Sequence, residues 1–159
     1  MTKSNGALMS ERLEVERTIE SLGDLRLIDY HTVGDEIVAQ VETLRKPVYC
    51  PICGTVAEPK DRRTSTIRDL PIGDRPLVLL WKKRVWNCTN SDCPQVTWTE
   101  SAEFVSSRHS LTNRAKLDLA RQALIEHVSV AQLAQKWKVS WSTAMSSIRE
   151  VEDQIKVSS

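Results

Sequence analysis

The sequence predicts an α+β fold, in which a strand-rich part is followed by a small all-α part. Three observations lead to this prediction. Apolar and polar residues alternate over residues 25–44, which is typical of half-buried strands. Two pairs of cysteines flank a second strand-rich segment between residues 50 and 93. From Ser110 onward the apolar residues recur at helical spacing instead.

The composition is that of a globular protein in water. Of the 159 residues, 40% are hydrophobic and 27% are charged. No apolar run approaches the roughly 18 residues that span a bilayer, and the stretch MTKSNGALMSERLEVERTIE lacks the apolar centre of a secretory signal. We therefore expect a cytoplasmic protein without membrane contact, in a reducing environment where structural disulfides are rare.

The charged residues are distributed unevenly along the chain. Residues 1–44 carry 4 basic and 9 acidic side chains, whereas residues 45–110 carry 11 basic and 7 acidic ones. Residues 111–159 carry 7 basic and 5 acidic side chains, and the net charge of the whole chain is +1. The basic middle and end favour a polyanionic partner; an ordinary solvated surface is the alternative interpretation.

The N-terminal residues predict a tail and one helix. Residues 1–9 are expected to form a loose tail. The Ser10 hydroxyl can accept hydrogen bonds from the first backbone N–H groups of a helix, and Gly23 can end that helix. We therefore predict a helix over residues 10–22, and we treat residues 1–23 as a unit separate from the strands that follow.

The strand-rich part is predicted to span residues 24–105. Its first two strands form a hairpin around Gly34, because glycine readily adopts the positive φ of a tight turn. Short runs rich in β-branched, leucine and tryptophan residues predict the later strands. The predicted strands are residues 25–33, 36–44, 64–70, 76–86 and 95–101.

The four cysteines of the chain form two pairs, Cys50 with Cys53 and Cys88 with Cys93. Their spacings are C-x2-C and C-x4-C, and the 34 residues between the pairs have room for a hairpin. Zn²⁺ prefers four tetrahedral ligands and binds thiolates well. The pattern therefore predicts a zinc ribbon with one structural Zn²⁺, closed by four protein ligands.

Other roles of the cysteines fit the sequence less well. A redox-active C-x2-C pair is expected to open a helix after a strand, whereas CPICGTVAEPKD has the composition of a turn and a loop. An iron site of the rubredoxin type usually has two residues inside its second pair, and here there are four. Four buried cysteines without a metal are a further alternative. His31, His109 and His127 lie outside both pairs and are expected to be ordinary surface or core residues.

Residues 106–159 are predicted to form a small all-α domain of three helices. Ser129 can cap the short second helix, and Ser140 can cap the third. The predicted buried stripes of the three helices are Leu117, Ala120, Leu124 and Val128; Val130, Leu133, Ala134 and Trp137; and Ala144, Ile148, Val151 and Ile155.

The last two predicted helices resemble a helix-turn-helix. Ala134 is the small residue needed where two such helices cross, Val139 can fill the turn, and Lys138 occupies the turn position where glycine is common. The side of the third helix opposite its buried stripe would be free to enter a DNA groove. The DNA-binding residues predicted here are Lys136, Lys138, Ser140, Trp141, Ser142, Thr143, Met145, Ser146 and Arg149. A plain three-helix bundle is the alternative.

Three segments, VYCPICG, RRTSTIRDLPIGDRPLVLLWKKRVWNC and CPQVTWTE, together resemble the N-terminal region of bacterial insertion-sequence transposases of the ISL3-like type. In that family an Arg-Asp-Leu-Pro segment follows a C-x2-C pair, two basic residues precede a cysteine, and an aromatic-x-Glu follows the last cysteine. The matching residues are Arg68 to Pro71, Lys83-Arg84, and Trp98 to Glu100. The resemblance covers about residues 25–155, and it implies a zinc ribbon followed by a helix-turn-helix.

The sequence departs from that family in one respect. The transposases continue into a large ribonuclease-H-like domain whose acidic residues bind the catalytic metal. This chain shows no such set of carboxylates, so we expect that it is not an enzyme. It would be either a part of such a transposase or a stand-alone descendant that kept DNA binding.

The predicted function is therefore sequence-specific binding of double-stranded DNA, as a transcriptional regulator or as the end-binding part of a transposase. Basic strand residues would contact the phosphate groups: Arg62, Arg63, Lys82, Lys83 and Arg84. A weak homodimer is expected, because helix-turn-helix proteins commonly bind as dimers. The alternative is a protein-interaction module from a phage, plasmid or mobile element that binds a host protein through its zinc ribbon.

Overall fold

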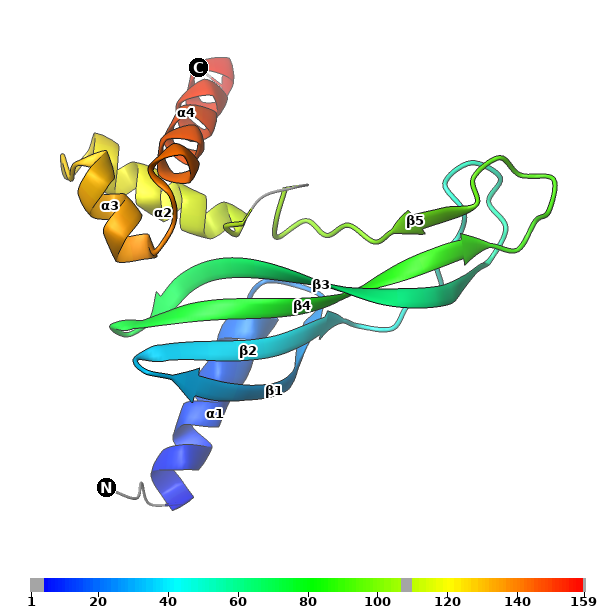
Figure 1. Cartoon of the computed structure of the whole chain (residues 1–159), viewed down its shortest axis with the longest axis horizontal. Helices are drawn as coiled ribbons and strands as arrows, with labels where there is room; N and C mark the ends of the chain where they lie inside the picture. Colours follow the sequence, from blue (N-terminus) through cyan, green and yellow to red (C-terminus); the bar gives the residue numbers. More distant parts are fainter. Residues whose placement is uncertain (1–4, 107–109, 159) are drawn as a thin grey trace.

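The computed structural model describes residues 5–106 and 110–158, and its elements confirm the predicted α+β class. One N-terminal helix comes first, strands follow it, and helices form the last part of the chain (Figure 1). The elements are α1 (Asn5–Glu20), β1 (Leu25–Val33), β2 (Glu36–Thr43), β3 (Ala57–Ile72), β4 (Arg75–Cys88), β5 (Thr97–Thr99), α2 (Asn113–Leu124), α3 (Val130–Trp137) and α4 (Trp141–Ser158).

The five strands form one mixed sheet in the order β1-β2-β4-β3, and β5 pairs with β4. β1 and β2 form the predicted hairpin around Gly34, whose φ is +60°. β3 and β4 form a long antiparallel hairpin around Gly73, whereas β2 runs parallel to β4. The β3–β4 ribbon continues beyond the other two strands, and the cysteines lie near its far end (Figure 1).

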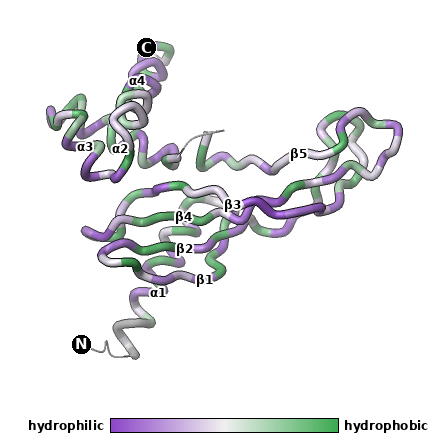
Figure 2. Tube along the Cα trace, in the orientation of Figure 1, coloured by the Kyte–Doolittle hydropathy of each residue, from purple (hydrophilic) through white to green (hydrophobic). Residues whose placement is uncertain are grey.

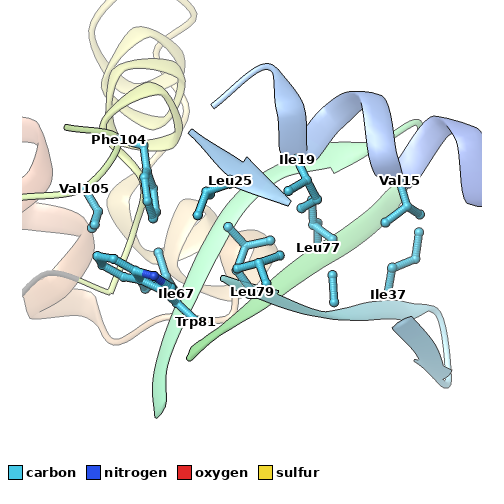
Figure 3. Close-up of a cluster of buried hydrophobic side chains, with 12 residues drawn as sticks. Val15, Ile19, Leu25, Ile37, Ile67, Leu77, Leu79, Trp81, Phe104 and Val105 are labelled. Atoms are coloured by element: carbon cyan, nitrogen blue, oxygen red, sulfur yellow. The ribbon is translucent and has the colours of Figure 1, made fainter. Parts of the chain in front are cut away.

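Helix α1 covers one face of the sheet and completes a first hydrophobic core. Val15 and Ile19, one helical turn apart, are fully buried and point toward the strands (Figure 3). At the other end of this core, the ring centroids of Trp81 and Phe104 are 4.9 Å apart. The buried members of this core are Val15, Ile19, Leu25, Ile37, Ala39, Val41, Ile67, Leu77, Leu79, Trp81, Phe104 and Val105.

A second hydrophobic core lies among α2, α3 and α4, and Leu70 of β3 packs against it. The predicted caps of α3 and α4 are confirmed, because the hydroxyls of Ser129 and Ser140 accept hydrogen bonds from backbone N–H groups in the first turn. The buried members of this core are Leu111, Ala115, Leu119, Ala120, Leu133, Ala134, Trp137, Ala144, Ile148 and Val151.

Several predicted element boundaries are wrong, among them those of β5, which was predicted over residues 95–101 and spans only Thr97–Thr99. Helix α1 begins at Asn5, so Ser10 lies inside the helix and residues 5–9 are not a loose tail; alanine, leucine and methionine in this segment are strong helix formers. Strand β3 begins at Ala57, seven residues before the predicted start. Its first half is exposed and hydrophilic (Figure 2), so it lacks the alternation that marks a half-buried strand.

Two predicted buried stripes are also partly wrong. Leu117 and Leu124 of α2 are 58% and 38% exposed, whereas the polar residues Lys116 and Gln122 are buried. Ile155 near the end of α4 is 56% exposed. Lys116 is buried because its ammonium group pairs with Glu150 of α4 at 3.1 Å, so this face of α2 joins α4 through a polar contact.

Candidate metal centre and nucleic-acid interface

The first cysteine pair lies on a tight turn before β3. The Gly54 N–H donates to the Cys50 carbonyl at 2.9 Å, and the Cys50 N–H donates to the Thr55 carbonyl at 2.8 Å. Gly54 has a φ of +76°, which glycine adopts without steric cost. The turn brings the sulfurs of Cys50 and Cys53 to one side of the chain.

The second pair lies where β4 ends. The Cys88 N–H donates to the Val96 carbonyl at 3.0 Å, which continues the pairing of β4 with the β5 side of the sheet. The Cys93 N–H donates to the Asn90 carbonyl at 3.1 Å and closes the loop between the two cysteines. Since β3 and β4 are paired along their length, both cysteine turns are held at the same end of the ribbon.

The four sulfurs form a compact cluster that fits Zn²⁺. The Sγ atoms of Cys50 and Cys93 are 3.7 Å apart, those of Cys53 and Cys88 are 3.6 Å apart, and all four lie within 4.8 Å of one another. A tetrahedron with Zn–S bonds of about 2.3 Å has edges of roughly 3.8 Å. All four cysteines are free, and the two distances are far longer than a disulfide S–S bond of about 2.05 Å.

The surroundings of the cluster lower the pKa of Cys50 and Cys53 and raise the pKa of Cys88 and Cys93. Hydrogen bonds from the side chain and the backbone of Thr55 lower the pKa of Cys53 to about 6, and the thiolate is the form that binds zinc. Cys50 and Cys88 are buried and Cys53 is exposed. Within residues 5–106 and 110–158, this is the one group of cysteine, histidine and acidic side chains close enough to hold a metal.

These features define a closed four-cysteine zinc ribbon with a single structural zinc site, because all four tetrahedral positions are taken by protein sulfurs. Residues 46–93 match a family described as the zinc-finger of transposase IS204/IS1001/IS1096/IS1165, the ISL3 family. The match covers less than a third of the chain and ends at Cys93. It confirms the predicted resemblance for the ribbon. No curated protein and no solved structure matches the chain significantly.

The outer side of α4 carries the residues that were predicted to meet DNA bases. Trp141 is 57% exposed, Ser142, Ser146 and Arg149 are exposed, and Met145 is half-buried. The opposite side of the helix is buried against α2 and α3. The predicted residues therefore share a solvent-facing side of α4.

Several predicted contact residues already have partners within the protein, including Ser142 and Ser146, whose hydroxyls hydrogen-bond to the Ser140 hydroxyl at 3.2 Å and to the Thr143 carbonyl at 3.1 Å. The Ser140 hydroxyl caps α4 by accepting from the Thr143 N–H at 3.0 Å, and it also donates to the Thr143 hydroxyl at 2.8 Å. The Lys136 ammonium group donates to the Gln122 side chain at 3.1 Å.

His31 and His127 are exposed and lie outside the sulfur cluster, and His109 lies outside the described residues.

The turn between α3 and α4 has a left-handed backbone at Lys138, with φ +54°. Its N–H donates to the Ala134 carbonyl, which is how glycine usually ends a helix. The Lys138 ammonium group lies 3.5 Å from Asp35 and 3.3 Å from Glu36, at the β1–β2 turn. The Arg68 guanidinium, together with Lys138, holds the pKa of Glu36 below its ordinary value.

Replacing Lys138 by glycine should relieve this left-handed backbone. We expect Lys138→Gly to be more stable than Lys138→Ala by about 1 kcal/mol, because both variants lose the ion pairs and only glycine avoids the Cβ clash. Urea unfolding of the two zinc-loaded variants measures the difference. Equal stabilities would show that the turn carries no strain.

The basic residues of the β3–β4 ribbon differ in their environment. Arg63 is exposed, and it is the cross-strand partner of Lys83. The Lys83 ammonium group lies 4.7 Å from the centre of the Trp81 ring. Lys82 donates to the Thr64 hydroxyl at 3.1 Å. The ribbon therefore presents cations on both of its faces, because successive strand residues point to opposite sides.

Arg62 and Arg84 take part in contacts within the sheet. Arg62 donates to Glu42 at 3.1 Å and remains 46% exposed. Arg84 is only 5% exposed, and its guanidinium donates to the Thr43 carbonyl and hydroxyl at 2.9 and 2.6 Å, with Glu100 at 4.0 Å. Because Arg84 lies inside the fold, it does not present its charge to a phosphate, and we leave it out of the proposed interface.

No helix within the described part of the chain is both long and apolar enough to cross a membrane.

Proposed function

We propose that this chain is a sequence-specific, zinc-containing DNA-binding protein related to the insertion-sequence transposases, acting in transposon-end recognition or in regulation. In this proposal α3 and α4 act as a helix-turn-helix, and α4 enters the major groove. The observation that carries the proposal is the solvent-facing side of α4, with Trp141, Ser142 and Arg149, in a chain whose ribbon matches a transposase zinc finger. The proposal assigns recognition, and no catalytic step, to this chain.

The two surfaces have different physical roles. Cations such as Arg63 and Lys82 attract the phosphate backbone of any duplex and make binding depend on salt. The hydroxyls, the indole and the thioether on α4 carry little charge but can meet base edges and thymine methyl groups in the major groove. A selection of bound duplexes from a random library is the direct test, because a sequence-specific protein enriches one motif.

Variants of the two surfaces should then separate affinity from specificity. We expect Arg63→Gln to weaken binding to all duplexes about equally. The slope of the logarithm of the binding constant against the logarithm of the salt concentration should become smaller by roughly 1. Ser142→Phe should cost on the order of 1–3 kcal/mol on the selected motif only. The control is Gln154→Phe, which introduces the same phenylalanine side chain at an exposed position near the end of α4. Titrations of labelled duplex at several salt concentrations measure both effects. Unchanged binding of the selected motif by Ser142→Phe would show that α4 does not recognise the base sequence.

A second candidate function is a protein-interaction module. Large apolar side chains of the ribbon are exposed to solvent, which is typical of docking surfaces: Tyr49 is 55% exposed, Ile52 63%, Val56 55% and Val96 65%. Co-purification with a host protein in the absence of DNA, together with weak and salt-independent duplex binding, would favour this function over the first.

A further inference from the structure

The Arg-Asp-Leu-Pro segment of β3, residues 68–71, belongs neither to the zinc site nor to the proposed DNA-binding surfaces. It contacts the start of the helical part instead. The Arg68 N–H donates to the Ser110 carbonyl at 2.8 Å, and the Thr112 N–H donates to the Arg68 carbonyl at 2.9 Å. Leu70 packs against the core of α2, α3 and α4. This end of β3 is therefore a docking strip for the helices.

Asp69 lies at the centre of the strip, and its side chain is fully buried. Its carboxylate accepts hydrogen bonds from the Thr112 hydroxyl at 2.7 Å and from two nitrogens of Arg114 at 2.9 and 2.5 Å. The Thr112 hydroxyl also accepts from the Ala115 N–H at 3.2 Å as the N-cap of α2. One buried carboxylate is thus bonded both to the cap of α2 and to a side chain in its first turn.

Arg114 extends the same network to α1. Its guanidinium donates to the Ser21 hydroxyl at 2.6 Å and to the Thr18 carbonyl at 3.1 Å. A guanidinium has its donors in a rigid planar fork, so these bonds fix the direction as well as the distance between the groups that they join. A single side chain of α2 therefore connects α1, β3 and α2.

The two hydrophobic cores do not fix this orientation by themselves, and the pairs of Lys138 with Asp35 and Glu36 lie at the partly exposed surface, where ion pairs contribute little. The first core ends with Val105 along the chain, and the second begins at Leu111, apart from the Leu70 contact. Apolar contact is non-directional, whereas a buried pair of ions tolerates little misalignment and its best-attested use is to set register.

We propose that the Asp69–Arg114 pair is a latch that holds the helical part in one orientation relative to the zinc ribbon. As a consequence, the chain recognises a composite DNA site, in which the base sequence read by α4 and the backbone gripped by the ribbon lie at one fixed spacing. Recognition of a composite DNA site rests on the proposed function, whereas the latch does not depend on DNA binding. Asp69 and Arg114 act as positioning residues.

The latch can be tested without DNA by nitrogen-15 relaxation of the zinc-loaded full chain. In the wild type we expect amides of β3 and β4 and amides of α2 to α4 to report one rotational correlation time. Arg114→Ala should give two, with a shorter time for the helices, and Arg114→Lys should also give two that differ by less. The control is Arg121→Ala, on the same helix but paired with Asp118 and Glu126 at the surface. A single correlation time in Arg114→Ala overturns the latch.

Dispersed amide signals and bound zinc show that both parts of a variant are folded. Should Arg114→Ala fail to fold, Arg114→Lys decides the matter, because lysine keeps the charge but cannot bridge both Asp69 oxygens and α1. Two correlation times in that variant support the latch, and a single one overturns it.

The composite site is tested with a selected duplex that carries five added base pairs between its two elements, half of the helical turn of about 10 base pairs. Wild type and Arg121→Ala should lose affinity by about tenfold, the size of one lost set of base contacts. Arg114→Ala should lose less than about twofold, because its parts can reorient. If wild type and Arg114→Ala lose the same amount of affinity for the lengthened duplex, the fixed spacing is overturned. A wild type that binds no duplex overturns the proposed function, while the relaxation data still decide the latch.

Discussion

Removal of zinc by a chelator is expected to unfold the ribbon and to leave α2, α3 and α4 folded. The far end of the ribbon holds few large buried side chains, so the metal is its main source of stability. Structural zinc contributes about 10–16 kcal/mol in small zinc-binding peptides, which is comparable to the whole stability of a domain. Loss of structure should fall within residues 45–105 and be greatest near the cysteines.

Elemental analysis and amide spectra measure this effect. Purified protein should contain about one zinc per chain, in keeping with its single cluster of four cysteines. Cys88→Ser should reproduce the effect of the chelator, whereas Ser91→Ala in the same loop should not. Acid should release the zinc, because protons compete with the metal for the thiolates. A folded protein without zinc and with four reactive thiols would contradict the site.

The second large effect is expected at Trp81, the largest fully buried side chain of the first core. Trp81→Ala should lower the free energy of unfolding by about 3–5 kcal/mol, since it removes the contact with Phe104 and leaves a cavity in the central strand. Trp81→Phe should cost less than half of that. The Trp81 Nε1 atom is buried without a hydrogen-bond partner among the residues that the structure describes, so phenylalanine loses no hydrogen bond there.

Urea unfolding of zinc-loaded protein measures the Trp81 variants. Trp141→Ala is the control, because Trp141 is 57% exposed and its removal should change stability by less than about 0.5 kcal/mol. If Trp81→Ala is as stable as the control, or if Trp81→Phe is as unstable as Trp81→Ala, the described packing is wrong.

The elements that could be predicted are those whose signals are local. The β1–β2 hairpin follows from alternation around Gly34, and the caps at Ser129 and Ser140 follow from hydroxyl residues just before apolar stripes. The first half of β3 could not be predicted in this way. Residues 58–64 are all exposed, so no burial pattern marks the segment, and it is a strand because β4 pairs with it.

Buried polar residues could not be predicted, because their partners are distant in the sequence. Arg84 was expected at the surface, but Thr43, 41 positions earlier, accepts its hydrogen bonds. Asp69 and Arg114 are 45 positions apart. The sequence signal for this network is the Arg-Asp-Leu-Pro segment, which resembles the transposase family but does not by itself indicate a partner for Asp69. The cysteines were predictable because one ion accounts for all four.

The parallel pairing of β2 with β4 has a consequence for the order of folding. The chain that joins these neighbours, from Thr43 to Arg75, contains the first cysteine pair and all of β3. The β3–β4 hairpin is local and can form early, whereas β2 must wait for the edge of β4 and close a long loop, which is slow. Zinc joins the two open ends of that hairpin, at Cys53 and Cys88. Because β2 pairs with residues 77–81 of β4, toward the Gly73 turn and away from the cysteines, we expect closure of this long loop, and not capture of the metal, to set how fast the first core forms.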